Sequence, residues 1–476
     1  MPIFSTICWF AALAIAYGIA LTPWWSCALP RSLPQRGFVL STAVLTTICY
    51  LCGLVSVAGL ALFPHRSDLF YLGLQFAVAL LIFWAARRLP GAARVGPTWF
   101  VQHGPWRRLD ILLAALVFTV ALVLVAMAVL LPLSSNDPLE YALVGREMYS
   151  LRALADYPLL NTDTPSGMYA PWTHPPLYIG LIFLANVISG GAELPGLMRL
   201  VAPMLTVMST ALIYWLGCAG GRRVGLLSAL IFITTPFIFA QAMYGAIDAL
   251  VISALLLGMA AVFACQPETL RGRLTIGVVM GLGLWSHSQA ILFPFLLGGS
   301  FLVVCGGLNK RMLTTALVVV LVGGAIGCWP YLRNVLIFGS PISDNNLVFA
   351  LSSLDWQGYF RLSRGYALMA DRLQYGLFKG WFTLHLYGLT WWWMLLGLIF
   401  LPRRGSPSPA WRQITHLCVA IIAIYLAGMG LSLFAGTDLM IRNDRYMLVL
   451  MPYVSLLAGW GVFRLAGNRQ VTAEAA

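Results

Sequence analysis

Apolar runs of about twenty residues, separated by polar segments, follow one another along most of the chain. A helix needs about 20 apolar residues to cross the roughly 30 Å of hydrocarbon in a bilayer. Backbone groups inside lipid must be paired within their own segment, so these runs predict helices rather than strands. The predicted spans are 3–22, 37–63, 69–86, 110–133, 198–220, 224–247, 249–265, 274–286, 290–307, 312–331, 384–402, 414–436 and 446–463.

Composition supports the same class. The chain has 476 residues, of which 60% are hydrophobic and only 9% are charged, whereas about a quarter of the residues in a soluble globular protein are charged. No stretch of useful size would fold as an ordinary soluble domain. We therefore predict an all-α polytopic membrane protein with about 13 transmembrane helices.

The net charge of +13 is distributed as membrane topology requires, rather than as a patch for nucleic acid. Basic residues sit mainly in short loops between apolar runs, and such loops face the cytoplasm. Thirteen spans with the N-terminus outside place 18 of the 29 basic residues inside, with 3 of the 16 acidic ones. The inner face then carries +15 and the outer face −2, whereas the opposite orientation would break the positive-inside rule.

Two long segments, 134–197 and 332–383, fall on the outer face in this topology, and we expect the chemistry there. Residues 177–189 are apolar enough to span, but a crossing there would move every later basic loop outside. We therefore expect 177–189 to form a juxtamembrane or re-entrant helix. A second juxtamembrane helix is predicted within the first loop, where an apolar stripe has helical spacing. Its members are Leu139, Leu143, Val144, Met148 and Leu151.

Asp137 has two interpretations. It is followed by Pro138 and Glu140, an order typical of a helix N-cap with an N1 proline and a capping box. A carboxylate held at a helix start just beyond a span would also suit a general base at the lipid boundary. The two roles are compatible, since a cap is one way of fixing a carboxylate.

Three more polar residues lie where an outer loop meets a span. His174 precedes two prolines that stiffen the backbone ahead of an apolar helix; the alternative is a surface histidine. Asp248 lies between two apolar runs, where an ionisable group is costly and hence a functional candidate; the alternative is a residue of a tight turn. His287, between two later runs, fits a ligand, a phosphate partner or a turn residue equally well.

Arginines gather at the same boundary. Arg333 follows Trp329-Pro330-Tyr331-Leu332, while Arg442 and Arg445 precede the last span. Guanidinium groups at a membrane interface often only extend toward water, but their forked donors also suit a phosphate. Both interpretations stay open on the residues alone.

The order of these motifs resembles a known superfamily, the protein O-mannosyltransferases and lipid A aminoarabinose transferases. These are membrane glycosyltransferases of the GT-C fold that use polyprenyl-phosphate sugars. The resemblance divides the chain into an extra N-terminal three-helix membrane segment (1–109), a GT-C-like transmembrane catalytic core (110–465) and a short cytoplasmic tail (466–476). The matching motifs are Asp137-x-x-x-Tyr141, His174-Pro175-Pro176-Leu177, Arg199-Leu200, a Gly-Arg-Arg turn, Tyr244-x-x-x-Asp248, Leu332-Arg333-Asn334 with Phe338-Gly339-x-Pro341, and Arg445-Tyr446 with Pro452.

The resemblance implies a polyprenyl-phosphate-linked sugar donor and a lipid, glycan or protein acceptor. Asp137 would deprotonate an acceptor hydroxyl, which attacks the anomeric carbon with inversion, and Asp248 would orient the acceptor or hold a divalent ion. The candidate metal ligands are Asp137, Asp248 and His287. No nucleotide cofactor is expected, because the chain has no Gly-rich phosphate loop. Binding of the leaving phosphate would fall to His174, His287, Arg333, Arg442 and Arg445.

The expected location is a bacterial inner membrane, with the active site on the periplasmic face. Two alternatives remain beside a transferase. A polymerase or ligase of lipid-linked glycans would share the outer-face arginines. A lipid or solute transporter would also be apolar and polytopic, but transporters tend to contain repeats and mid-membrane charges. We find no repeat, and the notable charges gather at one interface.

Overall fold

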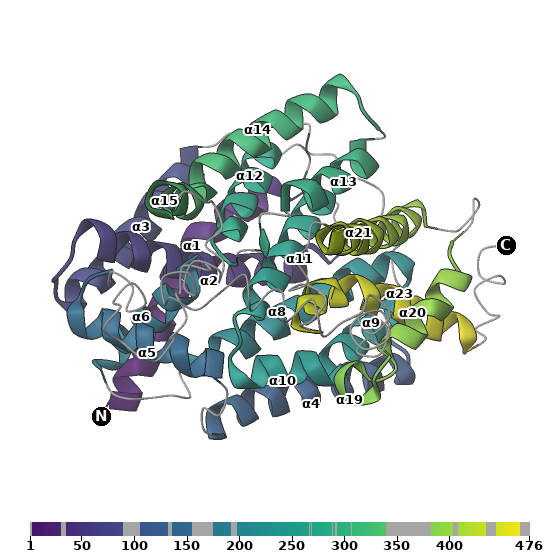
Figure 1. Ribbon diagram of the computed structural model, residues 1–476, viewed down its shortest axis with the longest axis horizontal. Helices are drawn as coiled ribbons and strands as arrows, with labels where there is room; N and C mark the ends of the chain where they lie inside the picture. Colours follow the sequence, from purple (N-terminus) through teal and green to yellow (C-terminus); the bar gives the residue numbers. More distant parts are fainter. Residues whose placement is uncertain are drawn as a thin grey trace.

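The structure is a computed structural model, and Figure 1 shows its arrangement of helices. For a few helical residues, Asp137 among them, it describes the backbone and not the side chain. The residues outside the description are 1, 30–34, 89–104, 132–135, 155–174, 192–197, 266, 268, 288, 291–292, 306, 339–381, 403–407, 435–443 and 467–476.

Each of the thirteen predicted spans contains a helix. The first half of the chain forms α1 (Pro2–Ala28), α2 (Arg36–Leu62), α3 (Asp68–Arg88), α4 (Arg108–Leu130), α5 (Asn136–Leu151), α6 (Leu177–Ser189), α8 (Val201–Gly217), η3 (Cys218–Gly220), α9 (Arg222–Thr234) and α10 (Pro236–Tyr244). The second half forms α11 (Asp248–Ala264), α12 (Leu270–Leu284), α13 (Phe293–Cys305), α14 (Lys310–Gly327), α15 (Trp329–Phe338), α19 (Leu384–Tyr387), α20 (Thr390–Ile399), α21 (Pro409–Phe434), η6 (Asp444–Leu450) and α23 (Met451–Leu465).

The chain is an all-α polytopic membrane protein, as predicted. Within the described ranges, eight helices are long and apolar enough to cross a bilayer, or nine if the bent pair α9 and α10 forms one span. Four predicted spans hold shorter helices. Helices α11, α12, α13 and α20 have 17, 15, 13 and 10 residues, below the roughly 20 that a straight crossing requires. Thirteen crossings therefore stay a prediction.

The break between α9 and α10 has a local cause. Pro236 is the first residue of α10, and a residue before proline is disfavoured in the helical region. Thr235 accordingly adopts an extended backbone with ψ of 117°, and the two helices meet at an angle of 59°. The Thr235 hydroxyl lies 3.0 Å from the Thr390 hydroxyl at the start of α20, so the kink also forms a contact between segments.

Ion pairs join residues that the charge pattern assigns to the same side. Asp110 at the start of α4 contacts Arg223 at 2.9 Å and Arg222 at 3.6 Å, and all three are predicted to lie inside. Asp68 contacts Arg152, and both are predicted to lie outside. These contacts agree with the predicted sidedness, which itself remains a prediction.

Helices α8 and α11 occupy the middle of the molecule, with the other elements around them (Figure 1). All 17 residues of α11 are buried, as expected for a helix that is apolar all round. Helix α4, by contrast, lies at the edge of the view and leaves Phe118 64% and Leu130 80% exposed. Such a surface suits lipid contact.

The two helices of the first loop that were predicted to be juxtamembrane differ in their surroundings. Every residue of α6 is buried in protein, whereas α5 packs one face on α6 and exposes the other. The residues of the predicted stripe on α5 divide between two sides of the helix. Val144 and Met148 are buried, but Leu139, Leu143 and Leu151 are exposed. The buried face instead includes Tyr141, because positions 141, 144 and 148 share one side of a helix.

The N-terminal helices pack directly against the predicted core. Helix α2 lies so close to α6 that a Cβ atom on Gly180 would meet the carbonyl oxygen of Gly53 at 2.6 Å. Helix α2 also contacts α11, where the Tyr50 hydroxyl donates to the carbonyl of Leu250 and lies 2.7 Å from the Ser253 hydroxyl. The boundary at residue 109 therefore does not separate independent packing units.

Candidate functional site

Asp248 is placed by a tight turn between α10 and α11. Gly245 ends α10 with φ of +82°, a conformation that glycine adopts without a Cβ penalty. The chain then reverses, and Asp248 becomes the first residue of α11. Its side chain is buried at 3% exposure, and the positive end of the helix dipole favours a carboxylate there.

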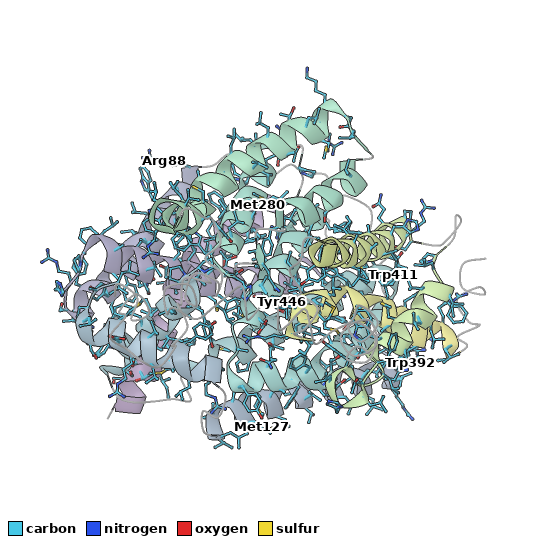
Figure 2. All side chains as sticks on the ribbon, viewed as in Figure 1. Arg88, Met127, Met280, Trp392, Trp411 and Tyr446 are labelled. Atoms are coloured by element: carbon cyan, nitrogen blue, oxygen red, sulfur yellow. The ribbon has the colours of Figure 1, made fainter. Side chains whose placement is uncertain are left out.

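Arg445 is the cationic partner of Asp248. The Nε atom of Arg445 donates to Oδ2 of Asp248 at 2.5 Å, across 197 positions of sequence. Arg445 belongs to η6, and the next residue, Tyr446, lies near the centre of the molecule (Figure 2). The Tyr446 carbonyl accepts a hydrogen bond from the Tyr425 hydroxyl on α21 at 2.8 Å. Helices α11 and α21 therefore both hold this short segment.

His287 lies beside this pair, in the turn after α12 and outside the spanning segments. It is buried, and its Nδ1 accepts the backbone N–H of Gln289 at 3.1 Å. An accepting Nδ1 is unprotonated, so the neutral ring carries its proton on Nε2. Burial, and to a smaller extent the nearby positive charge of Arg445, lower the pKa of His287 to about 3. His287 can therefore offer a neutral N–H donor to a phosphate, rather than a positive charge.

This lowered pKa predicts a pH-dependent stability. The unfolded chain binds a proton at His287 near pH 6.5, while the folded chain resists it down to about pH 3, so stability falls as the pH drops through this window. From pH 7 to pH 5 the expected loss is about 2 kcal/mol. Thermal unfolding in detergent should show a smaller loss for His287→Gln, whose amide oxygen can still accept the Gln289 N–H. An equal loss of stability between pH 7 and pH 5 in the original protein and in the His287→Gln variant would contradict the assignment of this pH dependence to His287.

Arg199 and Tyr178 are site residues to which the sequence assigned no role. Arg199 is buried, and its guanidinium donates to the carbonyls of Leu131 and, at 3.1 Å, Met243. It thus satisfies carbonyl groups at the C-terminal ends of α4 and α10. Tyr178 on α6 donates to the Gly245 carbonyl. In the sequence, Arg199 could be noticed only as an arginine immediately before an apolar run. An arginine that extends from the membrane interface toward water has the same position.

Gly245 offers a test of this packing. An added Cβ would lie 3.3 Å from Cγ of Arg199 and 3.5 Å from the Tyr178 hydroxyl, at a φ that L-residues rarely adopt. We expect Gly245→Ala to lower the free energy of unfolding by about 1–2 kcal/mol from the backbone alone, and by more from crowding. Gly190→Ala is the matched control, because Gly190 has φ of +62° and open space around its Cβ position. Equal losses of thermal stability in both variants would mean that crowding against Arg199 and Tyr178 does not add to the cost of the Gly245 substitution.

Arg333 lies on α15, next to the His287 turn. Tyr331 on this helix donates to the carbonyl of Leu284 at 2.9 Å and to that of His287 at 3.3 Å. Residues two apart on a helix point about 200° away from each other, so Arg333 leaves α15 on another side than Tyr331. The structure thus brings Asp248, His287 and Arg445 together and places Arg333 on an adjoining element.

The other predicted site residues fall partly or wholly outside the described residues. His174 and Arg442 are outside, as is the Asp137 side chain. The backbone of Asp137 is described in the first turn of α5. Tyr141, one turn later on the same face, packs edge-on against the ring of Tyr178 with centroids 5.6 Å apart. Since Tyr178 contacts Gly245, the start of α5 connects to the Asp248 turn through two aromatic side chains.

Metal binding by the predicted ligands receives little support from the described part of the chain. Among those residues, no three His, Cys, Asp or Glu side chains could share a metal ion. Asp248 already pairs with Arg445, and Nδ1 of His287 is occupied by a backbone N–H. The described donors therefore do not fit a metal site, and no step below uses one.

Part of the chain is similar to a known protein family. Residues 173–332 match the model of the dolichyl-phosphate-mannose-protein mannosyltransferase family. The matched segment is therefore similar to a family of the GT-C glycosyltransferase superfamily. This match supports a membrane glycosyltransferase with a lipid-phosphate sugar donor. The matched segment contains Arg199, Asp248 and His287, whereas Asp137 and Arg445 lie outside it. A search of curated proteins found no match.

Proposed function

We propose that this chain transfers a sugar from a polyprenyl-phosphate donor to an acceptor hydroxyl at the outer membrane face, with inversion at the anomeric carbon. The observation that carries the proposal is the cluster of Asp248, Arg445 and His287. A carboxylate, a guanidinium and a neutral imidazole meet there in protein otherwise built of apolar helices. Buried ionisable groups are costly within membrane proteins and mark functional sites.

The cluster suits the leaving group of such a reaction. The lipid phosphate gains charge as its bond to the anomeric carbon breaks, and fixed donors aimed at developing charge are a major source of catalysis. Arg445 would provide positive charge, oriented by its contact with Asp248, and His287 would provide an N–H. Arg333, Arg442 and His174 are proposed to complete the phosphate site.

Asp137 is the proposed general base. Its carboxylate would take the proton of the acceptor hydroxyl as the oxygen attacks the anomeric carbon. The electron pair of the broken carbon–oxygen bond stays with the polyprenyl phosphate. One sugar–oxygen bond forms and one breaks, so no oxidant, reductant or nucleotide is required. Asp248, already engaged with Arg445, is better suited to orienting groups than to accepting this proton.

Transfer of a labelled sugar from a polyprenyl-phosphate donor, measured in detergent, tests this function. A transferase forms product without a sealed membrane, whereas a transporter needs two compartments. A glycan polymerase or ligase would require a lipid-linked oligosaccharide instead of a single-sugar donor, so both donors should be offered. Product from neither donor in detergent, with transport in vesicles, would refute the proposal.

A further inference from the structure

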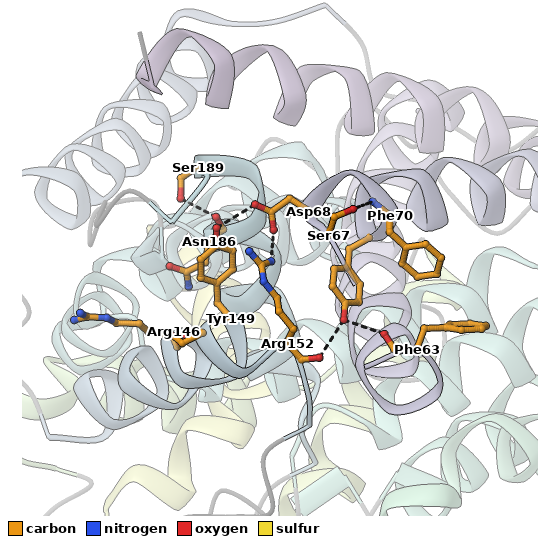
Figure 3. A network of polar contacts seen from close by, with 11 residues as sticks. Phe63, Ser67, Asp68, Phe70, Arg146, Tyr149, Arg152, Asn186 and Ser189 are labelled. Atoms are coloured by element: carbon orange, nitrogen blue, oxygen red, sulfur yellow. Dashed lines mark hydrogen bonds and ion pairs between the residues drawn. The ribbon is translucent and has the colours of Figure 1, made fainter. Parts of the chain in front are cut away.

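The C-terminal end of α5 is held by the turn between α2 and α3 (Figure 3). Arg152 follows α5 with φ of +53°, which is uncommon for a residue other than glycine. Its carbonyl accepts the N–H of His65 at 2.6 Å and the hydroxyl of Tyr71 at 3.2 Å. Nδ1 of His65 lies 3.0 Å from the carbonyl of Leu151. The carbonyl of Leu151, the last residue of α5, and that of the following Arg152 therefore both contact the N-terminal segment.

Side chains reinforce this attachment. The carboxylate of Asp68 at the start of α3 accepts from the Arg152 guanidinium and, at 3.1 Å, from the Tyr149 hydroxyl. The guanidinium carbon also lies 3.8 Å from the centre of the Tyr149 ring. The side chains of Arg152 and Asp68 are 23% and 29% exposed, so water screens this pair less than a fully exposed one. Figure 3 shows the three side chains converging.

The remainder of α5 packs against α6. A Cβ on Gly145 would meet Cγ2 of Ile182 at 2.4 Å, so the two helices touch closely at mid-length. The Tyr149 ring packs against Phe183 with centroids 6.4 Å apart. Contacts with α6 thus run along α5, from Tyr141 on Tyr178 to Tyr149 on Phe183. The Asp68 contact adds support from a second segment at the C-terminal end of the helix.

We propose that Asp68, Tyr149 and Arg152 form a latch through which the N-terminal three-helix segment orients α5 and thereby positions Asp137. Helix α5 has 16 residues and is thus about 24 Å long, and Asp137 lies in its first turn. A small rotation at the latch displaces that turn, and misplacement by about 1 Å can cost a reaction 100-fold. The latch rests on the proposed role of Asp137 as the base. It also gives the N-terminal helices a task in catalysis.

Asp68→Asn tests the latch in the full-length protein. We expect turnover to fall about 10-fold while the KM for the polyprenyl-phosphate sugar changes less than about twofold, and Asp68→Glu to recover most of the loss. In an Asp137→Asn background, Asp68→Asn should cause no further loss, because residues that act through one another are non-additive. Tyr149→Phe, which removes one hydrogen bond and keeps the ring, repeats the cycle if Asp68→Asn folds poorly.

The control is Asp110→Asn, which breaks the ion pairs with Arg222 and Arg223 at the start of α4. It should leave turnover near the original value. The latch is refuted if Asp68→Asn and Tyr149→Phe are fully active, if their losses persist in the Asp137→Asn background, or if Asp110→Asn gives the same loss. A fully active Asp137→Asn protein would instead refute the proposed base.

Discussion

Asp137→Asn should reduce sugar transfer by about 100-fold or more, because loss of a general base typically has this effect. The substitution keeps the shape of the side chain. Asn is accepted at a helix start about as well as Asp, so α5 should still form and thermal stability should change little. Turnover and unfolding temperature, measured on the same detergent preparation, separate the two roles of this residue.

Glu147→Gln is the matched control for Asp137→Asn. Glu147 is a carboxylate on the exposed face of the same helix, so its neutralisation changes the net charge of α5 equally. We expect transfer within about twofold of the unmodified protein, as for most surface substitutions. A well-folded Asp137→Asn protein with normal turnover would reduce Asp137 to a helix cap.

Arg445→Gln is expected to have the second largest effect. It removes a charge proposed to bind the donor phosphate and leaves the buried Asp248 carboxylate unpaired. The KM for the polyprenyl-phosphate donor should rise, and turnover should fall by roughly 100-fold, as it does when one fixed donor to developing charge is lost. Breaking a buried pair from one side also destabilises by about 3 kcal/mol.

The double variant Asp248→Asn/Arg445→Gln separates structure from function at this pair. It leaves no uncompensated charge, so the unfolding temperature should recover toward the original while transfer stays low. Arg464→Gln, in the last turn of α23, serves as the control for an arginine far along the same segment. Full activity in the double variant would mean that Asp248 and Arg445 only hold η6 against α11.

Local chemistry was sufficient to predict the class of the protein and the location of its helices. Apolar runs of membrane-spanning length impose helices regardless of what packs beside them. Pro236 lies inside the single predicted span 224–247, and its ring enforces a bend between α9 and α10 that was not predicted from the sequence. The exposed face of α5 was harder to predict. Leu139 and Leu143 are apolar and yet exposed. A leucine side chain can pack against lipid as well as against protein, so hydrophobicity alone does not show which face of the helix contacts protein.

The site depended on packing between segments far apart in the chain. The sequence singled out Asp248, His287 and Arg445 as polar residues at one predicted depth, but depth alone does not specify neighbours around the bundle. Only the tertiary structure pairs Asp248 with Arg445. It likewise makes His287 neutral, since burial and the charge of Arg445 act on its pKa together.

Arg199 and the latch residue Arg152 likewise have partners that only the tertiary structure reveals. In the sequence, Arg199 stands at the start of an apolar run and Arg152 lies in the first long loop, and in either place the charge can simply reach water. In the fold, Arg199 binds carbonyls at the ends of α4 and α10, and Arg152 joins α5 to Asp68. Helix formation depends on hydrogen bonds between residues four apart, so a sequence reveals it directly. The partner of a buried charge depends on which helices become neighbours, and the packing of the whole chain decides that.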